Sequence, residues 1–117
     1  MKTFTSTAAQ GDLLIRRVQS LPHNLTPVVP EAGAYIVAHS ETGHHHVVTA
    51  RPNVRYYDGA DPLVSYLEVI EATDETETLL EHLRGIDTHE AIKLPVGIYE
   101  MRRQREHTPE GWRRVAD

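Results

Sequence analysis

The sequence predicts one all-β domain over residues 1–117, a compact antiparallel β-barrel or sandwich with one short helix. Three observations predict it. Short runs rich in β-branched and aromatic residues recur along the chain, clusters of proline and glycine separate these runs, and one segment alone has the leucine spacing of a helix. A chain of this length can bury one hydrophobic core but not two, so we expect a single domain.

The first half of the chain is expected to hold a strand and a hairpin. GDLLIRRV, at 11–18, is a short β-rich run, and three prolines then keep the chain irregular up to Gly33. AYIVAH, at 34–39, alternates weakly, and the ETG that follows is a turn signal before HHHVVTA, at 44–50. The histidines would therefore open the returning strand of the hairpin.

Further strands are expected in the second half. Residues 53–57 and 63–72 carry β-branched and aromatic side chains around the turn YYDGADP. In HEAIKLPVGIYEMRRQRE, at 89–106, Pro95 and Gly97 form a turn or bulge between two β segments. The pattern amounts to six to eight strands.

DETETLLEHLRG, at 74–85, is the segment in which a helix is expected. Asp74 can cap its first turn with Glu77 three residues later, and Gly85 suits the position just past the last turn. The leucines between them lie at helical spacing: Leu79, Leu80 and Leu83.

The last long strand is expected to turn arginines inward. Tyr99, Met101, Arg103 and Arg105 fall on one face of it. If Tyr99 and Met101 point into the core, the two arginines continue that face. A desolvated arginine then needs a carboxylate or a phosphate ligand as its partner. The alternative is an ordinary strand end that has emerged into solvent.

Composition narrows the possible functions. The net charge is −5, but residues 58–90 carry ten acidic residues and one basic residue, a balance of −9, so the remainder carries +4. Five of the ten arginines lie between Arg102 and Arg114. The absence of cysteine excludes disulfides and thiolate metal sites, and no apolar run is long enough to span a membrane, so we expect a soluble, cytoplasmic protein. Seven aromatic residues and no basic stripe disfavour long duplex or single-stranded nucleic acid.

The histidines allow a metal site. In a strand, His44 and His46 project to the same side, and with His39 and His89 they could hold zinc or another divalent metal. The cupin barrel uses such a His-x-His pair. The glutamate that a cupin carries shortly after the pair is absent here, because residues 47–51 read VVTAR.

Acid–base chemistry on a phosphate is the second interpretation, and it needs no cofactor. One neutral imidazole could remove a proton while a protonated one donates to the leaving group. His89 shares a strand face with Lys93, which could hold a phosphate or a leaving oxygen. The arginines would neutralise the phosphate. A third interpretation is structural, with the histidines in a turn or merely hydrogen-bonded.

Several stretches together resemble a family of small prokaryotic and phage-borne proteins that is similar to the ring nucleases of type III CRISPR antiviral defence. These stretches are QGDLLI from Gln10, TGHHH from Thr42, HEAIKLPVGIYE from His89, RQRE from Arg103 and the closing PEGWRRVAD. The resemblance covers most of the chain.

The resemblance implies a metal-independent phosphodiesterase that cleaves a cyclic oligoadenylate, or a similar short RNA messenger, by attack of a 2′-hydroxyl. His44, His46 and His89 would be catalytic, and Arg103, Gln104 and Arg105, with Lys93, would bind the substrate. A small cyclic nucleotide of near twofold symmetry would also suit a homodimer. This hypothesis expects His44→Ala or His46→Ala to abolish cleavage and spare the fold. A cupin-like metal protein or a non-catalytic nucleotide binder remain the alternatives.

Overall fold

The computed structural model describes residues 2–38, 45–71, 77–82, 91–103, 105–108 and 111–114. These residues form β-strands and connections and include no helix. They therefore contain no helix of the length and apolarity that a membrane span requires. The strands are β1 (Thr7–Gln10), β2 (Leu13–Val18), β3 (Thr26–Pro27), β4 (Ala34–Ala38), β5 (His46–Thr49), β6 (Val54–Asp58), β7 (Val64–Val69), β8 (Leu79–His82), β9 (Ile92–Lys93), β10 (Gly97–Arg103), β11 (Arg105–Thr108) and β12 (Gly111–Arg114).

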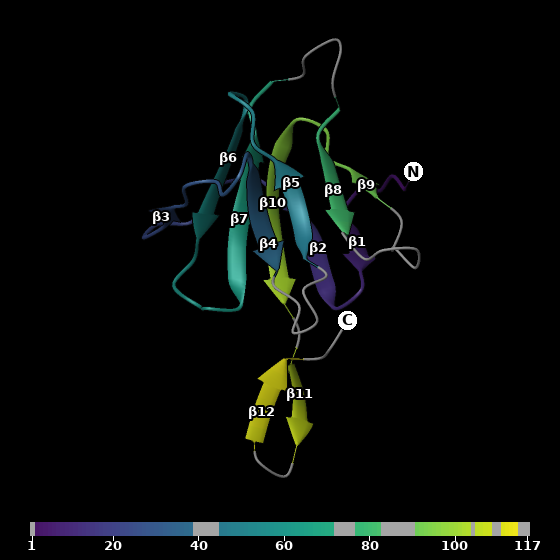
Figure 1. Ribbon diagram of the computed structural model, residues 1–117, viewed down its shortest axis with the longest axis vertical. Helices are drawn as coiled ribbons and strands as arrows, with labels where there is room; N and C mark the ends of the chain where they lie inside the picture. Colours follow the sequence, from purple (N-terminus) through teal and green to yellow (C-terminus); the bar gives the residue numbers. More distant parts are fainter. Residues whose placement is uncertain are drawn as a thin grey trace.

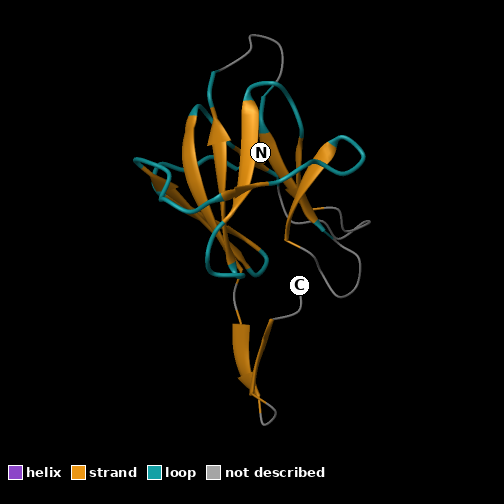
Figure 2. Ribbon diagram, turned by 90° about the vertical axis from the view of Figure 1, so that its left-hand side faces the viewer, coloured by secondary structure: helices purple, strands orange, loops and turns teal. Residues whose placement is uncertain are grey.

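Two antiparallel sheets build a sandwich (Figure 1). The larger sheet has the strand order β1-β2-β10-β7-β6-β3, and the smaller has the order β4-β5-β8-β9. Neither sheet of the described residues closes on itself, so the expected all-β fold is confirmed as a sandwich and not as a barrel. The hairpin of β11 and β12 is a separate two-stranded sheet that extends away from the sandwich in both views (Figures 1 and 2).

The core lies between the two sheets, where each strand turns its apolar side chains inward. In β10, alternation buries Tyr99, Met101 and Arg103, as the sequence predicts, and exposes Arg102. The facing β4 contributes Val37 from the smaller sheet. The side chains that are fully enclosed include Leu13, Ile15, Val37, Val48, Leu67, Leu80, Ile92, Tyr99 and Met101.

The hairpin predicted around the histidines is confirmed, because β4 pairs with β5 and Ala34 lies opposite Thr49. The strands predicted at 11–18, 53–57 and 63–72 correspond to β2, β6 and β7.

The helix predicted over 74–85 is wrong where the structure describes that segment. Residues 79–82 form β8, in which Leu80 pairs with Val48 on one side and with Ile92 on the other. Leu80 is fully buried. Burial of a central strand between β5 and β9 outweighs the weak local helix preference of the leucines and glutamates.

A tight turn between Glu31 and Ala34 leads into β4. The amide of each of these residues donates to the carbonyl of the other, at 2.8 and 3.0 Å. The two residues between them, Ala32 and Gly33, both have positive φ angles, 49° and 78°, as in a type I′ hairpin turn. Alanine rarely adopts this conformation, so the surrounding hydrogen bonds hold it there. The turn fixes where Glu31 stands relative to β4.

Candidate functional site

His46 lies inside the sandwich and joins its two sheets. Its ring is completely buried in β5, with Nδ1 2.8 Å from Oε1 of Gln10 and Nε2 3.6 Å from Oδ1 of Asp12. The Gln10 amide nitrogen donates to the carbonyl of Leu80 at 3.0 Å, so its oxygen is the group that faces the ring. Because an amide oxygen can only accept, Nδ1 of His46 carries a hydrogen and donates it.

This geometry favours a structural role for His46. Gln10 and Asp12 belong to β1 and the turn after it, in the larger sheet, whereas His46 and Leu80 belong to the smaller sheet. The hydrogen bonds therefore cross the core and give buried polar groups the partners that they need. A side chain that moves protons to an external substrate must reach that substrate. Proton transfer by His46 accordingly stays a prediction without support from its position.

Most of the other predicted site residues are not brought together in the described part of the chain. His39, His44, His89 and Gln104 lie outside the described residues. Arg105 begins β11, where it pairs with Arg114. Lys93 stands on β9, at the edge of the smaller sheet opposite β4, and its Nζ lies 2.9 Å from Oε1 of Glu77. Lys93 thus has a carboxylate partner of its own. The described residues contain no group of three potential metal ligands, and three of the four histidines of the metal hypothesis fall outside them.

Arg103, by contrast, occupies the position that the alternation of β10 predicts. Its side chain is only 9% exposed, Nη1 donates to the carbonyl of Val37 at 2.8 Å, and Nη2 donates to the carbonyl of Pro62 at 2.5 Å. The sequence analysis expected a carboxylate or a phosphate as partner for this guanidinium. Within the described residues its partners are instead two backbone carbonyls, and no carboxylate oxygen lies within 4.0 Å of it. Two N–H groups of the guanidinium thus have acceptors, but the described residues supply no carboxylate close enough to form an ion pair with it.

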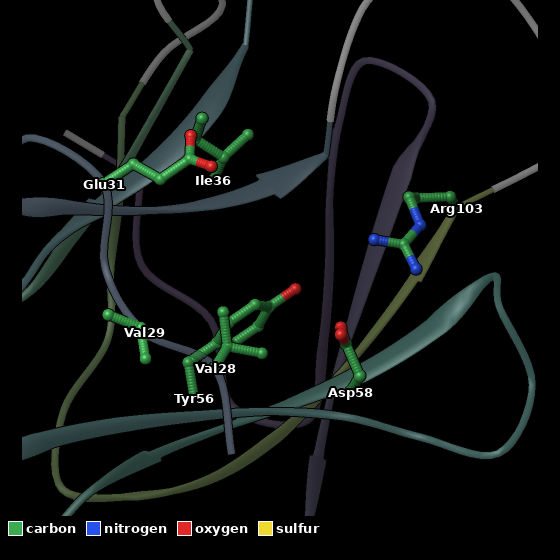
Figure 3. A pocket seen from close by; sticks show the side chains of 7 residues that line it. All are labelled: Val28, Val29, Glu31, Ile36, Tyr56, Asp58 and Arg103. Carbon is green, nitrogen blue, oxygen red and sulfur yellow. The ribbon is translucent and has the colours of Figure 1, made fainter. Parts of the chain in front are cut away.

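Arg103 lines a cavity of about 170 Å³ (Figure 3). Its other polar lining groups are Glu31, Tyr56 and Asp58, and its apolar wall consists of Val28, Val29 and Ile36. In Figure 3 the Asp58 carboxylate and the Tyr56 hydroxyl point toward the guanidinium, and Glu31 lies on the opposite side of the pocket from Arg103. We call this cavity the Arg103 pocket.

Tyr56 forms the floor of the Arg103 pocket as a neutral side chain. Its hydroxyl donates to the Val37 carbonyl at 3.3 Å and also contacts the Ser65 hydroxyl. Burial raises the pKa of Tyr56 above its ordinary value of 10.0, although the hydrogen bond with Ser65 and the charge of Arg103 act in the opposite direction. The hydroxyl is therefore a hydrogen-bonding group at neutral pH, not a charge.

The raised pKa of Tyr56 predicts a loss of stability in alkali. Above pH 10.0 the unfolded chain gives up the tyrosine proton while the folded chain keeps it, so the free energy of unfolding falls as the pH rises through the folded pKa. Urea unfolding between pH 8 and 11 should show this fall, and Tyr56→Phe should reduce its slope while costing about 1 kcal/mol at neutral pH. Tyr57→Phe, on the neighbouring position of β6, is the matched control. An equal alkaline fall in Tyr56→Phe and wild type would contradict the assignment to Tyr56.

Sequence reasoning found Arg103 but missed the rest of its pocket. Tyr56 and Asp58 share one face of β6, and alternation from Val54 could have placed them together. Glu31 and the two valines sit in a proline-containing segment that gave no signal of its own.

Comparison with known proteins shows the family of this chain. Residues 9–104 match the model of a family described as a domain of unknown function, DUF8820. This stretch runs from within β1 to just past the end of β10, and it includes all the residues of the Arg103 pocket. Neither the curated proteins nor the solved structures gave a match.

Proposed function

Because the chain belongs to the DUF8820 family, whose description assigns no activity, we propose its function from the Arg103 pocket: the protein binds one small organic acid. The acidic group lies against the Arg103 guanidinium, and the apolar body of the ligand lies against Val28, Val29 and Ile36. This is a binding function, and it requires no chemical step.

The observation that carries the proposal is the buried charge of Arg103. Burying a guanidinium is costly unless an anion accompanies it, and no carboxylate of the described residues lies within 4.0 Å. Each of its Nη atoms has a second N–H besides the one given to a carbonyl. Such N–H groups are donors from which a carboxylate can accept a charge-assisted hydrogen bond. Arg16 offers a contrast, because it pairs with Glu100 at 3.2 Å on the outer face of the larger sheet.

The size and the charge of the pocket limit the ligand. A cavity of about 170 Å³ is below the range of about 300–1,000 Å³ that is typical for drug-sized ligands, so it fits a molecule with few heavy atoms. Asp58 and Glu31 bring two negative charges to the same pocket. They would repel a doubly charged phosphate more than a singly charged carboxylate. Small size and acidic neighbours together favour a monocarboxylate.

The test is a titration with hexanoate, a carboxylate with an unbranched apolar tail. Amide chemical shifts in ¹H–¹⁵N spectra should move at Val28, Val29 and Asp58, and the affinity for 1-hexanol, which lacks the charge, should be at least about tenfold lower. Arg103→Met should abolish hexanoate binding. Arg16→Met removes an arginine outside the pocket, and it should bind hexanoate like the wild type.

A second variant tests the pocket without touching the core. Val29 is 80% exposed, so Val29→Asp should leave the fold intact and place a repelling carboxylate at the pocket wall. It should weaken hexanoate binding by about fivefold or more. Shifts that spread over the surface and are the same in Val29→Asp as in the wild type would overturn the proposal.

The phosphodiesterase hypothesis stays a prediction beside this proposal. Of its three catalytic histidines, His46 is the one whose side chain the structure describes, and that side chain is enclosed. Incubation with cyclic oligoadenylates and linear RNA in EDTA, followed by chromatography of the products, tests it directly. Cleavage in EDTA would support the hypothesis, and the absence of any product would leave the Arg103 pocket as the functional site.

A further inference from the structure

We infer that the ligand of the Arg103 pocket is a basic α-amino acid, of the size and charge of lysine. The inference rests on the proposed function, since it adds to the carboxylate on Arg103 two further contacts: the α-ammonium group with Asp58 and the side-chain cation with Glu31. The aliphatic part of the side chain then lies along Val28, Val29 and Ile36.

The pairing of Arg103 with Asp58 accounts for the α-carbon end of the ligand. Their charged groups face the same space in Figure 3, yet they are more than 4.0 Å apart and form no ion pair. Asp58 is exposed to solvent, and within the described residues its carboxylate forms no ion pair. An α-amino acid carries a carboxylate and an ammonium on one carbon atom. Its carboxylate can therefore pair with Arg103 while its ammonium pairs with Asp58, whereas a simple carboxylate can pair with Arg103 alone.

Apolar contacts account for the middle of the ligand. Val28, Val29 and Ile36 form one wall of the pocket, and Val29 is 80% exposed. Methylene groups that cover it remove apolar surface from water, which favours binding. Three or four methylene groups in a row are the part of a lysine side chain that suits such a wall.

Glu31 accounts for the far end. Figure 3 draws Glu31 and Arg103 on opposite sides of the pocket, and the hydrogen-bonded turn of Glu31 and Ala34 holds the Glu31 backbone in place. The three charged groups of the pocket sum to −1, one positive from Arg103 and two negative from Asp58 and Glu31. A ligand of charge +1 balances this sum, and lysine at neutral pH carries that charge. A neutral amino acid would leave the exposed Glu31 carboxylate to water instead of pairing it with a cation.

Three probes separate the three contacts. L-lysine carries all the groups, L-norleucine lacks the side-chain ammonium, and 6-aminohexanoate lacks the α-ammonium. Calorimetric titration of the wild-type protein should give lysine the highest affinity, about fivefold or more above norleucine, as one ion pair at a partly exposed site contributes. Glu31→Gln should abolish this preference by weakening lysine binding without weakening norleucine binding. Asp58→Asn should weaken norleucine by about fivefold and should not weaken 6-aminohexanoate, which lacks the α-ammonium and gains from the removal of a repelling charge.

Glu68→Gln is the matched control, because Glu68 on β7 lies opposite Arg55 on β6 and Ile98 on β10, outside the pocket. It should alter none of the three affinities. Equal binding of lysine and norleucine to the wild type, with hexanoate still bound in an Arg103-dependent way, would overturn the inference and leave the proposed function standing. Lysine affinity that survives Glu31→Gln would overturn it as well. Loss of hexanoate binding itself would remove the proposed function and the inference together.

Discussion

Replacing His46 with alanine should lower the free energy of unfolding by about 3 kcal/mol. The substitution removes a fully buried ring, and it leaves the amide oxygen of Gln10 without its 2.8 Å hydrogen bond in the interior of the sandwich. Loss of a partner for a buried polar group costs about 1–3 kcal/mol, and the cavity left by the ring adds to this cost. Equilibrium unfolding in urea, followed by circular dichroism, measures the difference.

The control for His46→Ala is His23→Ala, because His23 is exposed. It should change the free energy of unfolding by no more than about 0.5 kcal/mol. The same pair of variants distinguishes a structural role of His46 from a catalytic role. A structural His46 predicts a destabilised protein, whereas the phosphodiesterase hypothesis expects a stable protein that has lost cleavage. Unfolding of His46→Ala at the urea concentration of the wild type would contradict the structural role.

Leu67→Ala should also cost about 3 kcal/mol. Leu67 is completely buried in β7, between β10 and β6 of the larger sheet, where its side chain faces the smaller sheet. Substitutions of buried leucine by alanine cost about 2–5 kcal/mol, according to how far the cavity can collapse. The same urea unfolding experiment measures the loss.

Leu14→Ala provides the matched comparison for Leu67→Ala. Leu14 is 37% exposed on the outer face of β2, so the same change of side chain removes less buried surface. Its cost should stay below about 1 kcal/mol. Equal losses in the two variants would contradict the assignment of the core to the space between the sheets.

The sandwich was largely predictable, because strand alternation is a local property of the sequence. The run from Tyr99 to Arg103 places its odd-numbered residues on one face, and all three of them are buried, although Glu100 on the other face is buried as well. The helix prediction failed because the cap and leucine spacing of residues 74–85 are also local signals, and they carry no information on the strands that enclose Leu80. Burial between neighbouring strands therefore determined that residues 79–82 form a strand.

The candidate site was predictable only in part, since its contacts join distant parts of the chain. Alternation placed Arg103 on the inner face, but its hydrogen-bond acceptors belong to residues 66 and 41 positions away. The histidine run drew attention to His46, whereas its partner Gln10 lies 36 positions earlier. A sequence shows which side chains are able to do chemistry. It does not show which of them the fold encloses.

Arg103 also connects ligand occupancy to the cohesion of the two sheets. It belongs to β10 of the larger sheet, and its hydrogen bond to the Val37 carbonyl reaches β4 of the smaller one. A ligand that neutralises this guanidinium stabilises the same bridge, so the bound protein should melt at a higher temperature and exchange its β4 amide hydrogens more slowly. At a ligand concentration of one hundred times Kd, the added stability is about 2.7 kcal/mol. Thermal melting in a library of small metabolites can therefore serve as a search for the natural ligand, with Arg103→Met as the blank.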